Sequence, residues 1–175
     1  MVSKVMKIKS PLWNLVAFNV AWFGLVFIGD LFIPIAAILV GAQLWYFKST
    51  KNEILLICSV AALGICLDLA LVYSGVFIFP GTDGIPFWLI TLWIVFASTI
   101  RHSLAFLANS KLLQFVVGAI SAPLSYLAGA KLAVVDLGLS VGASYLLLAC
   151  LWGPFMVFMF ALSRWLLVKE KSYVG

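Results

Sequence analysis

Long apolar segments occupy most of this chain and constrain its fold more than any other feature. Hydrophobic residues make up 65% of the 175 residues, and charged residues only 10%. A soluble domain carries about 25% charged residues, because its surface must face water. In lipid, backbone groups must form their hydrogen bonds within the segment itself, and a helix satisfies this requirement. We therefore predict an all-α, polytopic membrane protein.

Each of several segments approaches the length of about 20 apolar residues that a spanning helix needs. They cover residues 12–28, 31–47, 54–76, 87–107, 112–134 and 141–168. The connections are short, so we predict a single transmembrane domain over residues 1–175, built as a bundle of six transmembrane helices. The first segment lacks a clear cleavage site, which favours an uncleaved helix over a signal peptide.

The distribution of basic residues predicts the orientation of this bundle. Six helices place both termini on one side, and Lys and Arg favour cytoplasmic connections. One side would carry Lys4, Lys7, Lys9, Lys48, Lys51, Arg101, Lys111, Arg164, Lys169 and Lys171. The other side would carry only Lys131, beside three aspartates. We therefore predict cytoplasmic termini. This orientation accounts for most of the net charge of +5, so no nucleic-acid partner is expected.

Polar residues near the cytoplasmic ends of the helices form a predicted inner layer. At about 1.5 Å of rise per residue, Asn19 lies about 10 Å deep and Gln43 about 6 Å deep. Arg101 and His102, within the stretch FASTIRHSLAFL, each lie about 10 Å deep. A continuous helix would turn their side chains about 100° apart. Arg101 is expected to reach toward the headgroups. His102 would either bond between helices or serve as a ligand contact or proton acceptor.

A second, outer layer is predicted around Asp68. This residue lies about 21 Å from the cytoplasmic end of its helix, and Ser125 and Tyr126 lie at a similar depth, below Lys131. A charged side chain at the centre of a spanning helix costs about 2.5–3.5 kcal/mol. Asp68 could be neutral, bonded to Tyr126, paired with Lys131, or part of a functional pocket. Of the tryptophans, Trp93 is expected at the membrane interface, where this residue type is common.

Metal and cofactor chemistry find no support in the residue pattern. His102 is the only histidine, and the three cysteines lack the close spacing of a metal-ligand pair. We therefore expect no metal and no cofactor.

Several stretches together resemble an uncharacterised bacterial inner-membrane family, known as domain of unknown function twenty-eight seventy-eight. The stretches are LWNLVAFNVAWF, LDLAL, PFWLITLWIVFASTIRHSL and APLSYLAGAKL. The matching residues include Asn14, Asp68, His102, Pro123, Ser125 and Tyr126. Asn19 and Arg101 depart from the pattern, since Gln and Asn are usual there. The resemblance implies a multi-pass location in the bacterial inner membrane and, through neighbouring genes for fatty-acid modification, a weak connection with lipids. It implies no activity.

These features favour a protein that binds or transports a small or lipid-like molecule through a polar intramembrane pocket. The ligand-binding candidates are Asn19, Asp68, His102, Ser125 and Tyr126. Weaker candidates are Asn14, Gln43, Trp22, Arg101 and Lys131. The expected partners are membrane lipid, the ligand, and a membrane protein that could dock on the small residues Ala17 and Ala21.

Two alternatives remain open at this stage. The first is an intramembrane enzyme or accessory factor in fatty-acid or lipid modification, with His102 as acid or base and Asp68 as a second carboxylate. The estimated depths of these two residues differ by about 11 Å, which argues against direct contact. The second alternative is a structural or assembly subunit without a ligand. The sequence does not decide whether the protein is an enzyme.

Overall fold

The computed structural model describes residues 11–172, with side chains to residue 168. The helices are α1 (Pro11–Ile28), α2 (Ile33–Phe47), α3 (Lys51–Tyr73), α4 (Phe87–Ala97), α5 (Lys111–Lys131) and α6 (Val141–Ser172). Two short 3₁₀-helices are η1 (Gly29–Phe32) and η2 (Ala105–Leu107), and two strands are β1 (Phe77–Ile78) and β2 (Asp136–Leu137). The predicted all-α class is therefore confirmed.

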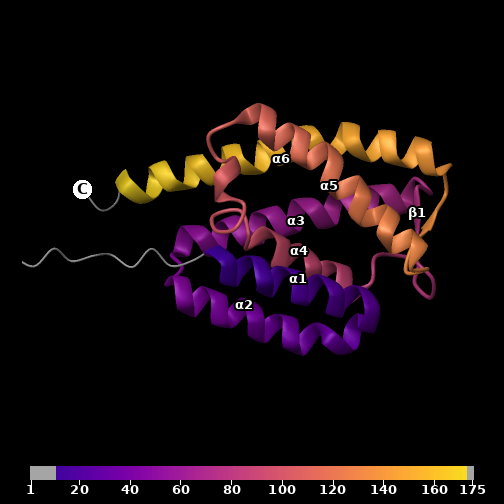
Figure 1. The fold of residues 1–175 in the computed structure, drawn as a ribbon, viewed down its shortest axis with the longest axis horizontal. Coiled ribbons are helices and arrows are strands. Elements are labelled where there is room, and N and C mark those ends of the chain that lie inside the picture. The colour runs from indigo at the N-terminus through magenta and orange to yellow at the C-terminus, as the bar shows by residue number, and fades with distance from the viewer. Residues whose placement is uncertain (1–10, 173–175) are drawn as a thin grey trace, which may run out of the picture.

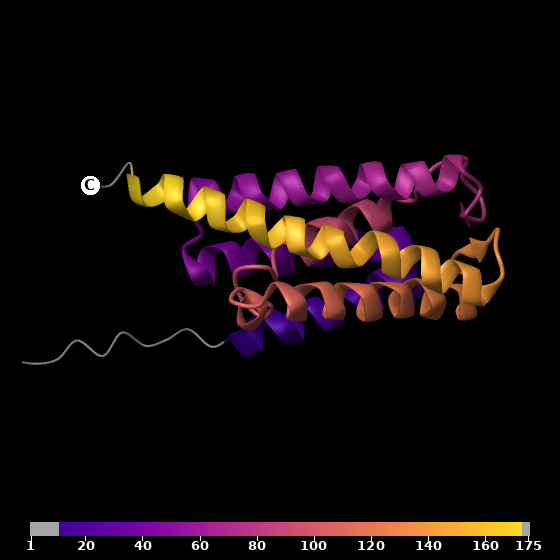
Figure 2. The ribbon, with the colours of Figure 1, turned by 90° about the horizontal axis from the view of Figure 1, so that it is seen from above.

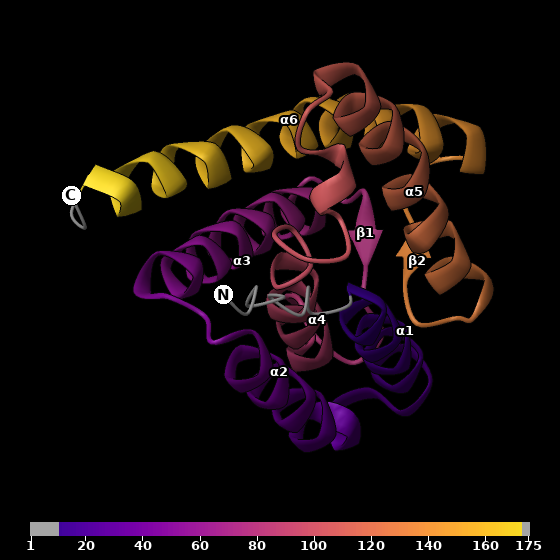
Figure 3. The same cartoon turned by 60° about the vertical axis from the view of Figure 1, so that its left-hand side comes forward.

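The helices pack side by side along the long axis of the molecule (Figures 1 and 2). α6 and α2 lie at opposite edges, with α3 and α4 between them (Figure 3). α1 begins and α6 ends at the same end of the molecule, which we call the near end; η1 and the strands lie at the far end (Figure 1). The main hydrophobic core joins α3, α4 and α6, and a smaller core joins Ala21, Leu25, Ala36 and Val95.

Within residues 11–172, four helical segments are long and apolar enough to cross a membrane: Pro11–Phe47, Lys51–Tyr73, Lys111–Lys131 and Val141–Val168. The first of them contains both α1 and α2, which η1 joins without a gap. The chain turns back between the two helices at Gly29, whose φ is 70°. Large apolar side chains cover the outer faces of these segments, including Leu31 (84% exposed) and Leu112 (74% exposed). An apolar outer surface of this kind indicates a membrane protein.

The predicted fourth helix is shorter than the sequence suggests. It was expected over residues 87–107, but α4 ends at Ala97, and turns and η2 follow. At about 1.5 Å per residue, its 11 residues span only about 16 Å. The hydroxyls of Ser98 and Thr99 donate to the carbonyls of Val95 and Phe96 at 2.6 Å each, and such bonds compete with a continuing helix. The helical phase expected for Arg101 and His102 therefore does not apply.

Short strand pairing at the far end links two connections between helices. β1 and β2 pair antiparallel, with Phe77 opposite Leu137 and Ile78 opposite Asp136. This pairing joins the α3–α4 connection to the α5–α6 connection. Asp30 of η1 also lies at this end, where its Oδ1 accepts from the backbone N–H of Trp88 at 2.8 Å, in the first turn of α4. The far end is thus closed by backbone and capping bonds.

Candidate binding cleft

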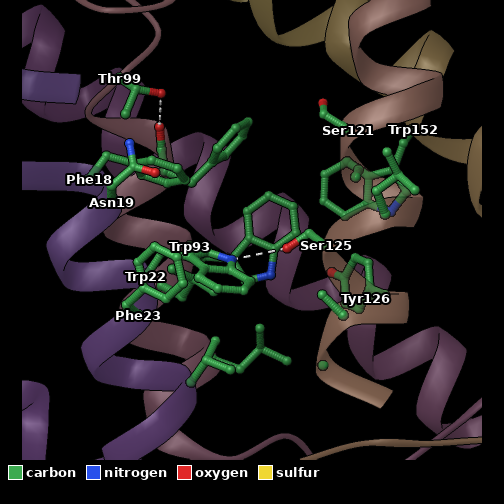
Figure 4. A pocket seen from close by; sticks show the side chains of 18 of the residues that line it. Phe18, Asn19, Trp22, Phe23, Trp93, Thr99, Ser121, Ser125, Tyr126 and Trp152 are labelled. Atoms are coloured by element: carbon green, nitrogen blue, oxygen red, sulfur yellow. Dashed lines mark hydrogen bonds between the residues drawn. The ribbon is translucent and has the colours of Figure 1, made fainter. Parts of the chain in front are cut away.

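A cleft of about 600 Å³ lies between α1 and α4 on one side and α5 and α6 on the other. Aromatic side chains supply much of its wall (Figure 4). They are Phe18, Trp22, Phe23, Phe79, Trp88, Trp93, Phe96, Tyr126 and Trp152. Ligand sites typically occupy about 300–1,000 Å³ and combine an apolar wall with a few polar groups. The cleft has both properties.

One hydrogen bond crosses the cleft between α1 and α5. The indole N–H of Trp22 donates to Ser125 Oγ at 3.0 Å (Figure 4). Asn19 lies one helical turn before Trp22, and its amide N–H donates to Leu15 O of its own helix at 2.8 Å. Ser121, one turn before Ser125, donates to Val117 O. The cleft therefore has a few neutral polar groups on both of its flanking helices.

The mouth of the cleft opens on the side of the bundle. Three of the apolar lining residues on α1 and α5 are about half exposed: Leu15 (46%), Phe23 (53%) and Leu124 (53%). Both helices belong to segments long and apolar enough to cross a membrane. The mouth is thus flanked by apolar surface rather than by the polar connections at the two ends.

Asp68 lies behind the wall of the cleft and does not line it. Its carboxyl group is completely buried, with one oxygen accepting from Trp93 Nε1 at 2.7 Å and the other from the Tyr126 hydroxyl at 2.6 Å. Trp93 and Tyr126 themselves line the cleft. Of the alternatives for Asp68, the structure therefore has the bond to Tyr126. Asp68 positions two rings of the wall.

Trp93 is held from its other side as well. Its indole lies against Gly64 of α3, where any added Cβ would overlap the ring. It also stacks on Trp152 of α6, with ring centroids 4.9 Å apart and an interplanar angle of 11°. The expectation of an interfacial Trp93 is wrong, since only 3% of this residue is exposed. The carboxylate of Asp68 explains the difference, because it gives the indole N–H a partner in the interior.

Trp152 contributes an unsatisfied donor to the same wall. Only 4% of the residue is exposed, and its Nε1 has no hydrogen-bond partner among the described residues. The great majority of buried polar groups have a partner. The nitrogen itself is enclosed by protein, so this donor is an unpaired group in the interior of the wall.

His102 belongs to a different cluster, at the near end. Its Nε2 lies 2.5 Å from Glu53 Oε1, and its ring stacks on Phe47 with centroids 3.8 Å apart. The neighbouring Arg101 donates to Ser163 of α6, from Nε to Oγ and from Nη2 to the carbonyl, at 3.3 Å each. Through these contacts, the segment that follows α4 is attached to α3 and to α6. The cleft is lined by none of these four side chains, which belong to Phe47, Glu53, Arg101 and His102.

The proposed pairing of His102 with Asp68 in one site is therefore not supported. His102 contacts Glu53 of α3, and Asp68 lies 15 residues further along the same helix. That spacing corresponds to about 22 Å. Asn19 and His102 were also expected in one inner layer, but they lie in different places, since Asn19 lines the cleft and His102 does not.

Two weaker candidates, Asn14 and Gln43, hold the backbone after α4. Both amides donate to Ser98 O, at 3.5 Å from Asn14 and 2.9 Å from Gln43. Asn14 Oδ1 also accepts from the N–H of Ser103 at 3.0 Å. α4 ends inside the bundle, so its last carbonyls need partners within the protein. These two buried amides supply the partners of the Ser98 carbonyl.

Of the remaining candidates, some line the cleft and others do not. Trp22, Ser125 and Tyr126 line the cleft, whereas Lys131 is exposed at the end of α5 and is not a partner of Asp68. Ala17 and Ala21 are buried within this chain, so they offer no surface for docking another protein. Over residues 11–172, no group of three or more His, Cys, Asp or Glu side chains could hold a metal ion.

Sequence reasoning missed Glu53, Trp93 and Trp152 as members of these clusters. Glu53 had a local signal, because it stands three residues after Thr50 at the start of α3 and its backbone N–H bonds to the Thr50 hydroxyl at 3.3 Å. That signal marks a helix start. The long-range partner His102 has no comparable signal in the sequence.

Comparison with known families gives one match. Residues 11–158 match the family described as "Protein of unknown function (DUF2878)". The chain belongs to this family. The DUF2878 match contains every residue that lines the cleft, from Leu15 to Met156. Searches of curated proteins and of solved structures give no match. The function of this DUF2878 protein must therefore be inferred from its own geometry.

Proposed function

We propose that this DUF2878 protein is an integral membrane protein that binds a lipid-like molecule in the cleft between α1 and α5. One observation carries the proposal: an aromatic and apolar cleft of about 600 Å³ opens sideways between two membrane-type helices. A molecule dissolved in the bilayer would reach this mouth without passing through water. Transport would follow if the bound molecule leaves toward one side of the membrane.

The arrangement of the helices supports a placement across the bacterial inner membrane with both termini in the cytoplasm. The near end carries Lys48, Lys51 and Lys111, and basic residues favour the cytoplasmic side. In this placement all of α1 to α6 enter the bilayer, with α4 ending inside it. Irregular backbone at membrane depth is tolerated where it is buried in protein or lines a cavity. The bonds of Asn14 and Gln43 to Ser98 meet that condition.

An acid–base enzyme built on His102 and Asp68 has weaker support. Glu53, the partner of His102, lies about 22 Å from Asp68 along α3, by the helical rise. Both oxygens of Asp68 are already engaged by Trp93 and Tyr126. We therefore favour binding over chemistry.

Retention of lipid through purification tests the proposal. The protein is extracted in detergent, and the lipids that remain bound are identified by mass spectrometry. Ser121→Trp places a large ring in the mouth, whereas Ala37→Trp adds the same ring to an exposed position on α2 that does not line the cleft. We expect a lipid species that the wild type and Ala37→Trp retain and Ser121→Trp loses. Equal retention by all three would contradict a ligand in this cleft.

A further inference from the structure

The polar side chains of the cleft are unevenly distributed along its length. On the near side of the bond between Trp22 and Ser125, the lining contains an amide and three hydroxyls, from Asn19, Thr99, Ser103 and Ser121. Figure 4 shows Asn19 and Thr99 above the level of that bond. On its far side, the lining consists of the Trp88 indole and of apolar residues, which include Val26, Phe79, Leu89, Val134 and Val135.

This polarity gives the cleft a direction. We propose that a lipid-like ligand lies in it with its polar group beside Asn19 and Ser103 and its hydrocarbon chain toward the far end. The ligand class is an amphiphile whose polar group both donates and accepts hydrogen bonds, such as an alcohol or an amide. In the proposed placement of the protein, this ligand comes from the cytoplasmic leaflet. The inference rests on the proposed function and adds the direction and the polar contacts of the ligand.

The amide of Asn19 is the first group available to a ligand. A primary amide carries two N–H donors and an acceptor oxygen. One N–H bonds to Leu15 O at 2.8 Å, and within residues 11–172 the amide has no other hydrogen bond. The side chain is exposed, and Asn19 and Leu15 both line the cleft. The oxygen and the second N–H are therefore free at the surface of the cleft.

The hydroxyl of Ser103 is the second available group. Ser103 is half-buried and lines the cleft, and its hydroxyl has no hydrogen-bond partner in the described chain. Unlike the Trp152 nitrogen, its oxygen is not enclosed by protein. The backbone N–H of Ser103 bonds to Asn14 of α1, and Asn19 lies about 8 Å further along that helix. The amide and the hydroxyl thus belong to the same part of the cleft.

The two possible directions of an amphiphile differ at both of its ends. With the polar group toward the far end, that group would lie among side chains such as Phe79 and Val135, and hydrocarbon would cover Asn19 and Ser103. Polar groups that are buried without hydrogen bonds are unfavourable. With the polar group toward the near end, the amide and the hydroxyl gain partners and the chain packs on apolar side chains.

Photolabelling in nanodiscs tests the direction. Two hexadecanol probes carry a diazirine either beside the hydroxyl or at the end of the chain. Peptide mass spectrometry locates the labels, and those that Ser121→Trp prevents are assigned to the cleft. We expect the diazirine beside the hydroxyl to label the segments around Asn19 and Ser103, and the diazirine at the chain end to label those around Phe79 and Val135.

Other labelling patterns separate the direction from the binding function. The reverse pattern, or one pattern shared by both probes, would overturn the direction and leave the binding function intact. If neither probe gives a label that Ser121→Trp prevents, the binding function itself is contradicted.

Asn19→Leu tests the amide and keeps a side chain of similar size. Below saturation, we expect cleft labelling by the alcohols to fall about fivefold, the equivalent of one ordinary hydrogen bond. Labelling by hexadecane with the same chain-end diazirine should stay unchanged. Asn109→Leu, at an exposed position that does not line the cleft, is the matched control. An unchanged alcohol signal, or an equal fall for hexadecane, would overturn the role of the amide. If Asn19→Leu does not fold, Ser103→Ala tests the polar contacts with the same probes and the same expected result.

Discussion

Two buried carboxyl groups on the same helix have opposite surroundings. Glu53, in the first turn of α3, contacts an imidazole that can carry a positive charge. Asp68, four turns later, contacts only neutral donors, the Trp93 indole and the Tyr126 hydroxyl. The Glu53 contact ties a connection to the bundle, and the Asp68 contacts orient rings of the cleft. The comparison teaches that an ionisable residue in a membrane-type helix can have either of two roles. It can attach a connecting segment to the bundle, or it can orient the side chains that form the binding site.

Asp68→Ala should produce the largest effect, because it removes both bonds at once. We expect the free energy of unfolding to fall by about 3 kcal/mol, with two buried donors left unpaired. Lipid retention should fall as well, since Trp93 and Tyr126 lose their orientation. Unfolding in detergent, followed by tryptophan fluorescence, measures the first effect. In Asp68→Asn, whose amide oxygen still accepts one bond, the free energy of unfolding should fall by less. Unchanged lipid retention in folded Asp68→Ala would show that Asp68 does not shape the cleft.

Gly64→Ala tests the same region without touching a polar group. The new methyl group overlaps the indole of Trp93, so overpacking should cost about 2 kcal/mol and displace the ring. The melting temperature and the amount of retained lipid should both decrease. Gly41→Ala on α2 is the matched control, because its methyl group would meet no atom within 4 Å. A wild-type melting temperature for Gly64→Ala would refute the close contact with Trp93.

His102→Ala addresses the other carboxyl group. Loss of the bond to Glu53 and of the stacking on Phe47 should lower the free energy of unfolding by about 1.5 kcal/mol. Lipid retention by the folded fraction should stay at the wild-type level, in contrast to Asp68→Ala. Arg101→Ala, which loses its bonds to Ser163, should behave in the same way. Loss of lipid from folded His102→Ala would remove the distinction between the two regions.

Ser125→Ala should have the smallest effect. It removes the acceptor of the Trp22 indole, the bond that crosses the cleft, and should cost about 1 kcal/mol. Ser121→Ala is the control, since that hydroxyl bonds within its own helix. Faster exchange of bound lipid in Ser125→Ala than in Ser121→Ala, measured with isotope-labelled lipid and mass spectrometry, would link the bond to access through the mouth. Identical rates would confine its role to stability.

The parts of the structure that sequence could predict are those set by composition and local periodicity. The all-α class and the membrane-type segments follow from long apolar runs, and Asn19, Trp22, Ser125 and Tyr126 do line the cleft. The end of α4 was missed because its causes are partly distant: Asn14 and Gln43 stabilise the freed backbone from 84 and 55 residues away. No pattern within one helix contains such information.

The division between the polar clusters was missed for a related reason. Depth estimates treat each helix as complete and upright, so they placed Asn19 and His102 in one layer. The short α4 invalidates that assumption for His102 and moves it into a turn that contacts Glu53, 49 residues earlier in the chain. Sequence reasoning also considered the polar residues more than the rings, although aromatic side chains form much of the cleft wall.

The early end of α4 has a consequence for how the chain is made. A helix of 11 residues is too short to span a bilayer by itself, so it is a poor signal for membrane insertion. The groups that hold the backbone and imidazole after it, Asn14, Gln43 and Glu53, all precede it in the chain. During synthesis from the N-terminus, α1, α2 and α3 leave the ribosome first. Their side chains are therefore already present to bind α4 and the turn after it, a segment too short to insert into lipid by itself.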